Sequence, residues 1–205
     1  MVKRLLITIA SLLLIAGCSG SSDGLPAPTV ELNSEIPPDY ITYTSEGLFS
    51  ISYPPELVVD TESMKTYAEI PLKEVRTVFD GYIPKDGGTA AIIMIRVTPA
   101  WGNRTLWDIG LWTWYDIRES QPEAVFYSQN VTAVDGREAI ILKYSTSELH
   151  LGEWCTTNLY TVKDGLVWWV TCDTRPEDLE NYEDTFYNIL SSFRILTRWW
   201  SRWTM

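Results

Sequence analysis

The chain has 205 residues, of which 45% are hydrophobic and 21% charged, and this balance is typical of a globular protein. Its formal net charge of −11 argues against nucleic-acid binding, which needs a basic surface, and against electrostatic adhesion to anionic lipid. Beyond a leader and a linker, the length leaves room for one domain with a core of its own.

Residues 1–17 have the features of a bacterial export signal. Lys3 and Arg4 precede an apolar run that is too short to span a bilayer comfortably. The motif at 14–18, Leu-Ile-Ala-Gly-Cys, resembles the bacterial lipobox, in which the cysteine is acylated and becomes the mature N-terminus. We therefore predict a lipid anchor on Cys18 and an extracytoplasmic location at a bacterial membrane. A plain signal peptide or an uncleaved anchor is the alternative.

The residues after the leader divide into three parts. Residues 18–39 are rich in Ser, Gly and Pro and poor in aromatic residues, which predicts a flexible tether. Residues 40–197 are expected to form the domain. Residues 198–205 form a tail in which Trp199, Trp200 and Trp203 lie beside Arg198 and Arg202. These tryptophans could pack on the domain, rest at the lipid headgroups, or contact a partner or a sugar.

The first part of the domain reads as β-structure. Short strands are expected at 40–44, 48–53 and 57–59, and an extended pattern runs from 66 to 79. Glycines and a proline between 81 and 88 predict a loop. The run at 89–98 is too apolar to alternate and should be a central strand.

A helix is predicted to begin at Thr105, with Asp108 completing a capping-box-like start. One stripe at helical spacing consists of Leu106, Ile109, Trp112 and then Tyr115 or Asp116, and a second apolar stripe consists of Trp107, Leu111 and Trp114. A helix that is apolar nearly all round is either deeply buried or lies at an interface, and deep burial is the simpler interpretation.

Two hairpins are the strongest structural signal of the chain, at 131–144 and 155–172. Each has an Asp-Gly turn between β-branched and aromatic residues, because glycine accepts the positive φ of a tight turn. Cys155 and Cys172 lie on the two strands of the second hairpin. Export and a matching register would allow a disulfide between them, and two buried free thiols are the alternative.

The last predicted helix begins at the sequence Thr174-Arg175-Pro176-Glu177, which reads as a capping box. Its apolar stripe runs from Leu179 to Phe193, so the helix should lie on the sheet. A short closing strand is expected at 193–196.

The chain resembles the PsbP-like domains over about residues 40–196. The resemblance lies in the order of three motifs: the opening at 43–54, the strand pair from Val134 to Ala139 and onward, and the helix end at 189–193. It implies an α+β fold, an α/β/α sandwich with a central, mainly antiparallel sheet covered by helices. Members of the family act mainly by binding proteins, among them a photosystem II subunit and a nuclear-transport factor that binds a small GTPase.

No catalytic residue or metal ligand is predicted, and no cofactor. His150 is the only histidine. A serine triad would have to use it as the base, and a zinc site of the usual kind would need more ligands than His150, Cys155 and Cys172. We expect a non-enzymatic lipoprotein of the bacterial cell envelope that binds another envelope protein. The surface formed by Trp107, Leu111, Trp114 and the C-terminal tryptophans is its candidate contact. A small ligand or glycan bound on tryptophan faces is the alternative, and an envelope hydrolase comes third.

Overall fold

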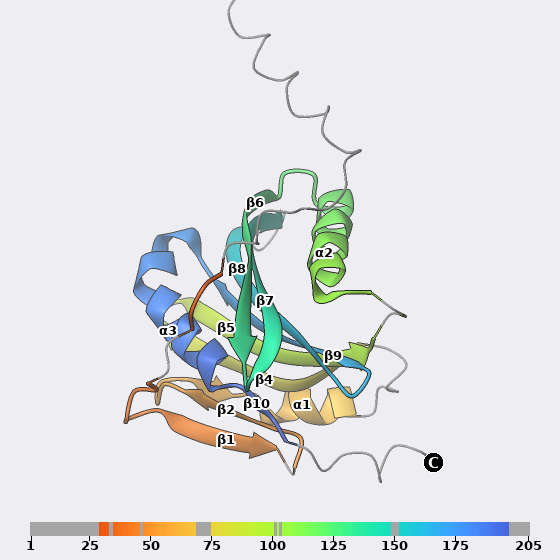
Figure 1. Ribbon diagram of the computed structural model, residues 1–205. Helices are drawn as coiled ribbons and strands as arrows, with labels where there is room; N and C mark the ends of the chain where they lie inside the picture. Colours follow the sequence, from red (N-terminus) through yellow and green to blue (C-terminus); the bar gives the residue numbers. More distant parts are fainter. Residues whose placement is uncertain are drawn as a thin grey trace, which may run out of the picture.

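The computed structural model describes residues 29–32, 35–45, 47–68, 75–100, 102, 104–148 and 152–196. These residues form two antiparallel sheets, three α-helices and one 3-10 turn (Figure 1). The large sheet has seven strands in the order β3-β4-β5-β9-β8-β7-β6. The bounds of its strands are β3 Val58–Val59, β4 Arg76–Lys85, β5 Gly88–Pro99, β6 Val125–Val134, β7 Arg137–Glu148, β8 Gly152–Lys163 and β9 Leu166–Thr174.

The remaining elements cover this sheet. The small sheet has the order β1-β2-β10, with bounds β1 Ile41–Ser45, β2 Phe49–Tyr53 and β10 Arg194–Ile195. The helices are α1 Thr61–Ala68, α2 Leu106–Ser120 and α3 Leu179–Ser192, and the 3-10 turn η1 is Pro176–Asp178. In Figure 1, α2 and α3 lie on opposite sides of the large sheet, which is the α/β/α arrangement that the resemblance implied.

Both predicted hairpins are confirmed. β6 pairs with β7, and β8 pairs with β9, each through an Asp-Gly turn. The φ angles are 52° and 67° at Asp135 and Gly136, and 56° and 74° at Asp164 and Gly165. Two successive positive φ angles define the type I′ turn, whose twist matches that of the flanking strands.

The apolar run at 89–98 is a central strand, because β5 pairs with β4 on one side and β9 on the other. The loop expected at 81–88 is wrong, since β4 continues to Lys85. Gly81 lies within β4 because a Cβ there would come within 2.7 Å of Leu57 Cδ2. The prediction of extended structure from residue 66 is also wrong at its start, because helix α1 continues to Ala68. Asp60 accepts hydrogen bonds from the amides of Glu62 and Ser63, which caps that helix.

One face of the large sheet carries the main core. Alternate side chains point to opposite faces of a strand, so paired residues such as Ile95, Val170 and Leu159 share a face. The small sheet and α3 cover this face, and their buried aromatic residues meet there. Phe49 packs against Trp168 and Phe193, with ring centroids 6.2 and 6.1 Å apart.

Helix α3 has the predicted apolar stripe but a different start. Phe186, Ile189 and Leu190 are buried against the core. The capping box predicted at 174–177 is wrong, because Thr174 remains in β9 and its hydroxyl donates to the carbonyl of Ala90 at 2.8 Å. The chain passes through η1 before α3 begins, with no side-chain cap at either start. β10 confirms the closing strand and pairs with β2.

The opposite face of the large sheet is covered by α2 over β7 and β8. Its core is smaller and centres on Ile109 of α2, packed with Ile140, Leu142 and Tyr160. Part of the predicted tether also lies on the domain. Thr29 bridges to Val131 of β6 in parallel, and Leu32 packs against the main core.

Candidate functional site

Helix α2 begins at the capping box that the sequence predicts. The Thr105 hydroxyl accepts a hydrogen bond from the Asp108 amide at 3.2 Å, and the Asp108 carboxylate accepts one from the Thr105 amide at 3.0 Å. Hydrogen bonds from Thr105 lower the pKa of Asp108 below its ordinary value. The helix therefore has a defined first turn.

Only one side of α2 is buried, so the expectation of deep burial is wrong. Its two buried residues are Ile109 and Gly110. A Cβ on Gly110 would lie 2.6 Å from Ile140 Cδ1 and 2.7 Å from Gln129 Oε1, so the glycine allows close approach of the helix to β6 and β7. Gln129 in turn donates to the Trp107 carbonyl at 3.3 Å. The remaining apolar residues of α2 lie on its other side.

We call the exposed apolar residues of α2, together with Phe126 at the neighbouring start of β6, the aromatic face. Their side chains are between 36% and 61% exposed, and the residues are Trp107, Leu111, Trp112, Tyr115 and Phe126. At 3.6 residues per turn, the four helical members fall within about 140° of the helix circumference. They therefore form one continuous side of α2, opposite the side that Ile109 buries.

Trp114 joins the two elements of the aromatic face. It is half-buried, and its ring centroid lies 5.3 Å from that of Phe126 and 6.4 Å from that of Tyr144. Burial of Tyr144 raises the pKa of its hydroxyl to about 12. Trp114 was predicted to share a surface with Trp107 and Leu111, but its ring supports that surface from within and contributes to stability.

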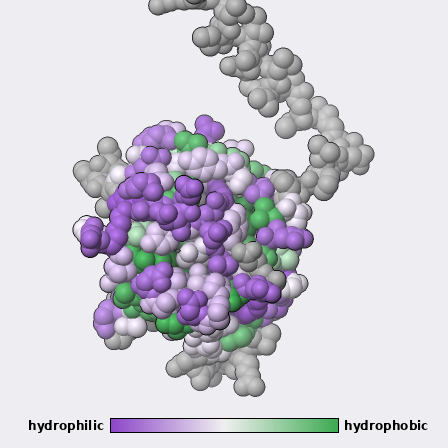
Figure 2. Space-filling view, turned by 90° about the vertical axis from the view of Figure 1, so that its left-hand side faces the viewer, coloured by the Kyte–Doolittle hydropathy of each residue, from purple (hydrophilic) through white to green (hydrophobic). Residues whose placement is uncertain are grey.

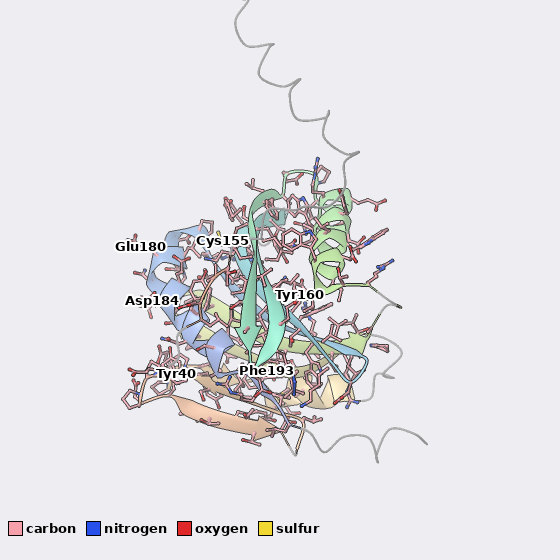
Figure 3. All side chains as sticks on the ribbon, viewed as in Figure 1. Tyr40, Cys155, Tyr160, Glu180, Asp184 and Phe193 are labelled. Carbon is pink, nitrogen blue, oxygen red and sulfur yellow. The ribbon has the colours of Figure 1, made fainter. Side chains whose placement is uncertain are left out.

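Charged side chains surround the aromatic face. Arg104 lies over the Trp112 ring, with 4.4 Å between its guanidinium carbon and the ring centroid. The exposed carboxylates of Asp116, Glu119 and Glu123 border the same end of the helix as Arg118. The opposite side of the molecule differs, because α3 presents a largely hydrophilic surface there (Figure 2). In Figure 3, Glu180 and Asp184 project from the outer side of α3.

The predicted disulfide does not form in this structure, where Cys155 and Cys172 are buried free thiols. Cys155 lies opposite Thr174, and Cys172 lies opposite Thr157. The thiols share a face but are diagonal neighbours, whose Cα atoms are about 7–8 Å apart and thus beyond the usual disulfide separation. Burial raises the pKa of both thiols, which disfavours the reactive thiolate.

Several predicted site residues lie outside the described residues, namely Cys18, His150, Trp199, Trp200 and Trp203. Within the described residues, no group of three or more His, Cys, Asp or Glu side chains could hold a metal ion. No helix in the described part of the chain is long and apolar enough to cross a membrane.

Sequence reasoning placed Trp112 and Tyr115 on the same stripe as Ile109, which is buried, and it missed Phe126. A helix that is apolar on both sides gives no periodicity from which the buried side can be chosen. Gly110 held a usable signal, because a glycine in mid-helix often marks a close backbone approach. Residues on the helical side opposite Gly110 and Ile109 could then have been assigned to solvent.

No protein-family model matches this chain, and no curated protein matches it by sequence. Solved structures do resemble it. Cyanobacterial PsbP from Synechocystis has a TM-score of 0.54 at 12% identity, covering 86% of this chain and 97% of its own. A Pseudomonas aeruginosa protein of unknown function has a TM-score of 0.52 at 14% identity, covering 78% and 97%.

The Ran-binding protein Mog1p of Saccharomyces cerevisiae is a third similar structure, with a TM-score of 0.50 at 9% identity, covering 78% of this chain and 96% of its own. At such identities the similarity concerns the fold and no single functional residue. The antiparallel sheets and covering helices described above agree with these structures. The chain has the α+β fold of PsbP and Mog1p.

Proposed function

We propose that this protein is a lipid-anchored module of the bacterial cell envelope that binds another protein without catalysing a reaction. The aromatic face is the observation that carries the proposal. Monomeric proteins rarely expose large contiguous apolar patches, and those that do use them for interaction. Tryptophan and tyrosine, three of the five members here, are also the residues most enriched in binding hot spots.

The surroundings of the aromatic face indicate what partner would fit. Three exposed carboxylates, those of Asp116, Glu119 and Glu123, border its C-terminal end, and the whole chain carries a net charge of −11. A partner with an apolar centre and a basic rim would complement both features. Rim charges affect mainly the rate of association, so binding should weaken moderately as salt increases.

Site-specific photo-crosslinking tests the proposed surface. A benzoylphenylalanine at Tyr115 of the full chain, expressed in a bacterium with a matching envelope, should give one discrete adduct after irradiation. The same group at Tyr82, which is an exposed tyrosine of β4 away from the face, is the matched control. Equal adducts from both positions, or none from Tyr115, would count against the aromatic face as the contact.

A double substitution separates binding from stability. Trp107→Ala with Leu111→Ala should abolish the Tyr115 adduct while lowering the free energy of unfolding by less than about 3 kcal/mol, because more than a third of each side chain is exposed and full burial would cost about 2–5 kcal/mol for each. A large loss of stability would instead show that these residues belong to the core.

The membrane anchor rests on the lipobox and is tested independently. Cys18→Ser should leave an uncleaved precursor that takes up no labelled palmitate, whereas the wild-type chain is labelled. Equal labelling of the two chains would exclude Cys18 as the lipid site. It would leave the proposal for the aromatic face untouched, since that surface does not depend on how the domain is anchored.

A further inference from the structure

The outer edge of β6 is only half covered by the residues that the structure describes. β6 is the last strand of the large sheet, and its outer edge pairs with the chain at Thr29 alone among them. Thr29 bridges to Val131 in parallel, and the Val30 amide donates to the Val131 carbonyl at 2.9 Å. Because the bridge is parallel, the chain after Thr29 runs toward the C-terminal end of β6. We call the N-terminal half of β6, residues 125–130, the open edge.

The hairpin register shows which backbone groups of the open edge point outward. A two-residue turn places Val134 in a hydrogen-bonded pair, and such pairs alternate with non-hydrogen-bonded pairs along an antiparallel ladder. Every second ladder position counted from there therefore points its N–H and C=O away from β7. Val131 is one of them, as its bond to Val30 shows. Gln129 and Phe126 are the next two.

A β-bulge lies within the open edge, but it preserves this pattern. The register skips Tyr127, which has no partner on β7. The residues of β7 opposite Gln129 and Phe126 are Leu142 and Tyr144, which are two positions apart. The outward groups of Gln129 and Phe126 therefore keep the spacing of an ordinary ladder. Together they supply two N–H and two C=O groups to which an added strand can bond.

The side chains of the open edge are apolar and exposed. Val125, Phe126 and Tyr127 are 49%, 42% and 53% exposed, and residues 125–130 contain no charged residue and no proline. Natural proteins protect exposed edges with short strands, charges, proline or bulges, and only the bulge is present here. At the other edge of the same sheet, β3 has only two residues. The open edge is therefore suited to the addition of a strand.

The chain before Thr29 is poorly suited to fill this position itself. The Val30 amide faces β6, and the amides that face one neighbouring strand recur at every second residue. A strand continued upstream would therefore have to donate to β6 from positions 28 and 26. Both are prolines, which have no N–H.

The charges beside the open edge indicate the chemistry of the occupant. Glu123 lies two residues before β6, and Asp116 and Glu119 lie in the C-terminal part of α2. All three carboxylates are exposed, and Arg118 is the only cation in residues 105–130. A second copy of this chain would bring like charges together at this edge, which is unfavourable. A segment with lysine or arginine would be attracted instead.

We propose that the partner of the aromatic face is an extended segment of another protein that adds as a strand to the open edge of β6. The segment has apolar side chains at alternate positions, and lysine or arginine at the end that lies beside Glu123. This inference rests on the function proposed above, because it specifies the partner of the same surface. Phe126 links the two, since its ring lies 5.3 Å from that of Trp114 and its backbone belongs to the open edge. Backbone hydrogen bonds supply affinity in this mode of binding, and side-chain pockets supply specificity.

Photo-crosslinking from the open edge tests the proposal. Benzoylphenylalanine at Tyr127 of the full chain, in the same bacterium that is used for the Tyr115 experiment, should give an adduct with the same protein. Mass spectrometry of the two adducts should locate both crosslinks within one stretch of that protein. The stretch should carry alternating apolar residues and at least one lysine or arginine. A crosslink within one chain would assign the edge to the chain's own residues, and an adduct of two copies would assign it to a dimer; either result overturns the proposal.

Two variants test whether the backbone edge is used, each read out at the Tyr115 adduct. Gln129→Pro removes an N–H that points away from β7, and Gln129→Ala is its matched control, because both lose the bond to the Trp107 carbonyl. Gln129→Pro should give about 10-fold less adduct than Gln129→Ala, the loss expected for one strong backbone hydrogen bond. Tyr127→Lys, which places a charge on the edge, should also reduce the adduct, whereas Tyr82→Lys on β4 should not. Circular dichroism establishes that each variant is folded, and Tyr127→Lys decides the matter if Gln129→Pro is not.

The outcomes separate this inference from the proposed function. Absence of a Tyr115 adduct in the wild-type chain would overturn both. A Tyr115 adduct that is as strong in the folded edge variants as in their controls would keep the aromatic face as the contact and reject strand addition. Crosslinks that fall on a helix of the partner, or on an acidic stretch, would also reject it.

Discussion

The two faces of the seven-stranded sheet are built from alternate residues of the same strands, yet they differ in almost every physical respect. The face under α3 and the small sheet buries a continuous set of aliphatic and aromatic side chains, including Phe49, Phe79 and Phe186. The face under α2 has a smaller apolar core and carries Asn158, Thr171 and Arg96 among its residues. We infer that the first face supplies most of the stability, because it carries the larger buried apolar cluster.

Removal of a ring from the main core should have the largest effect. Phe49 is fully buried and packs against Phe79, Trp168 and Phe193. Phe49→Ala should lower the free energy of unfolding by about 3–5 kcal/mol, through lost burial and the remaining cavity. Urea denaturation measures it, with Tyr115→Ala as the exposed control. Similar losses for both variants would contradict the contrast between the faces.

Filling the contact under α2 should have the next largest effect. Gly110→Ala gains helix propensity of about 1 kcal/mol, but its Cβ would lie within 3 Å of Ile140 and Gln129. Overpacking of this kind costs about 1–3 kcal/mol, so we expect net destabilisation. Asp116→Ala, at an exposed position of the same helix, reports propensity without the clash. A stabilised Gly110→Ala variant would mean that the helix lies further from the sheet.

Loss of the cap of α2 should cost less. Thr105→Ala removes the hydroxyl that accepts from the Asp108 amide and should destabilise the protein by about 1 kcal/mol at neutral pH. The pKa of Asp108 is lowered in the folded state, so its contribution is present above the ordinary pKa of 3.8 and is lost as pH falls through the folded value. The difference between wild type and Thr105→Ala should shrink in acid. A difference that is constant between pH 7 and pH 2 would exclude the reciprocal cap.

The smallest effect is expected at Asp80, which lies on the α2-covered face of β4. Burial and the neighbouring Asp60 raise the pKa of the Asp80 carboxyl, although Arg96 partly opposes the shift. A raised pKa means that ionisation destabilises the fold once pH exceeds the ordinary value of 3.8. Asp80→Asn should therefore raise the free energy of unfolding slightly at pH 7, by less than about 1 kcal/mol because solvent screens the group. At pH 3 the two chains should melt alike, and a gain that persisted there would point to another cause.

Local signals predicted the elements that local chemistry determines. The Asp-Gly turns, the Thr105 cap and the apolar run of β5 all depend on a few neighbouring residues, and all were identified. The start of α3 was missed because Thr174 has the right spacing for a cap but is the last residue of β9. Its hydroxyl donates a hydrogen bond to the Ala90 carbonyl. β4 was cut short because Gly81 reads as a turn residue, whereas its role is to make room for Leu57.

The cysteine register was available from the sequence but was not used. A two-residue turn at Asp164-Gly165 pairs Lys163 with Leu166, and counting back along both strands places Cys155 opposite Thr174. The candidate sites were harder to predict, because they depend on tertiary contacts. Gly110 is the one local signal of which side of α2 faces the sheet, and no local pattern indicates that Arg96 lies against Met94.

If Cys18 carries the proposed lipid, the bridge between Thr29 and Val131 limits the distance between the domain and the membrane. Thr29 follows Cys18 by 11 positions, and a fully extended chain of that length spans at most about 40 Å. The bridge is parallel, so the chain reaches the domain from the end of the sheet where Phe126 and the aromatic face lie. With a lipid on Cys18, the end of the sheet that carries Phe126 would be held near the bilayer. The aromatic face would then stay within about one domain diameter of the membrane. Its effective concentration for a membrane-bound partner would be far higher than that of the same domain free in solution.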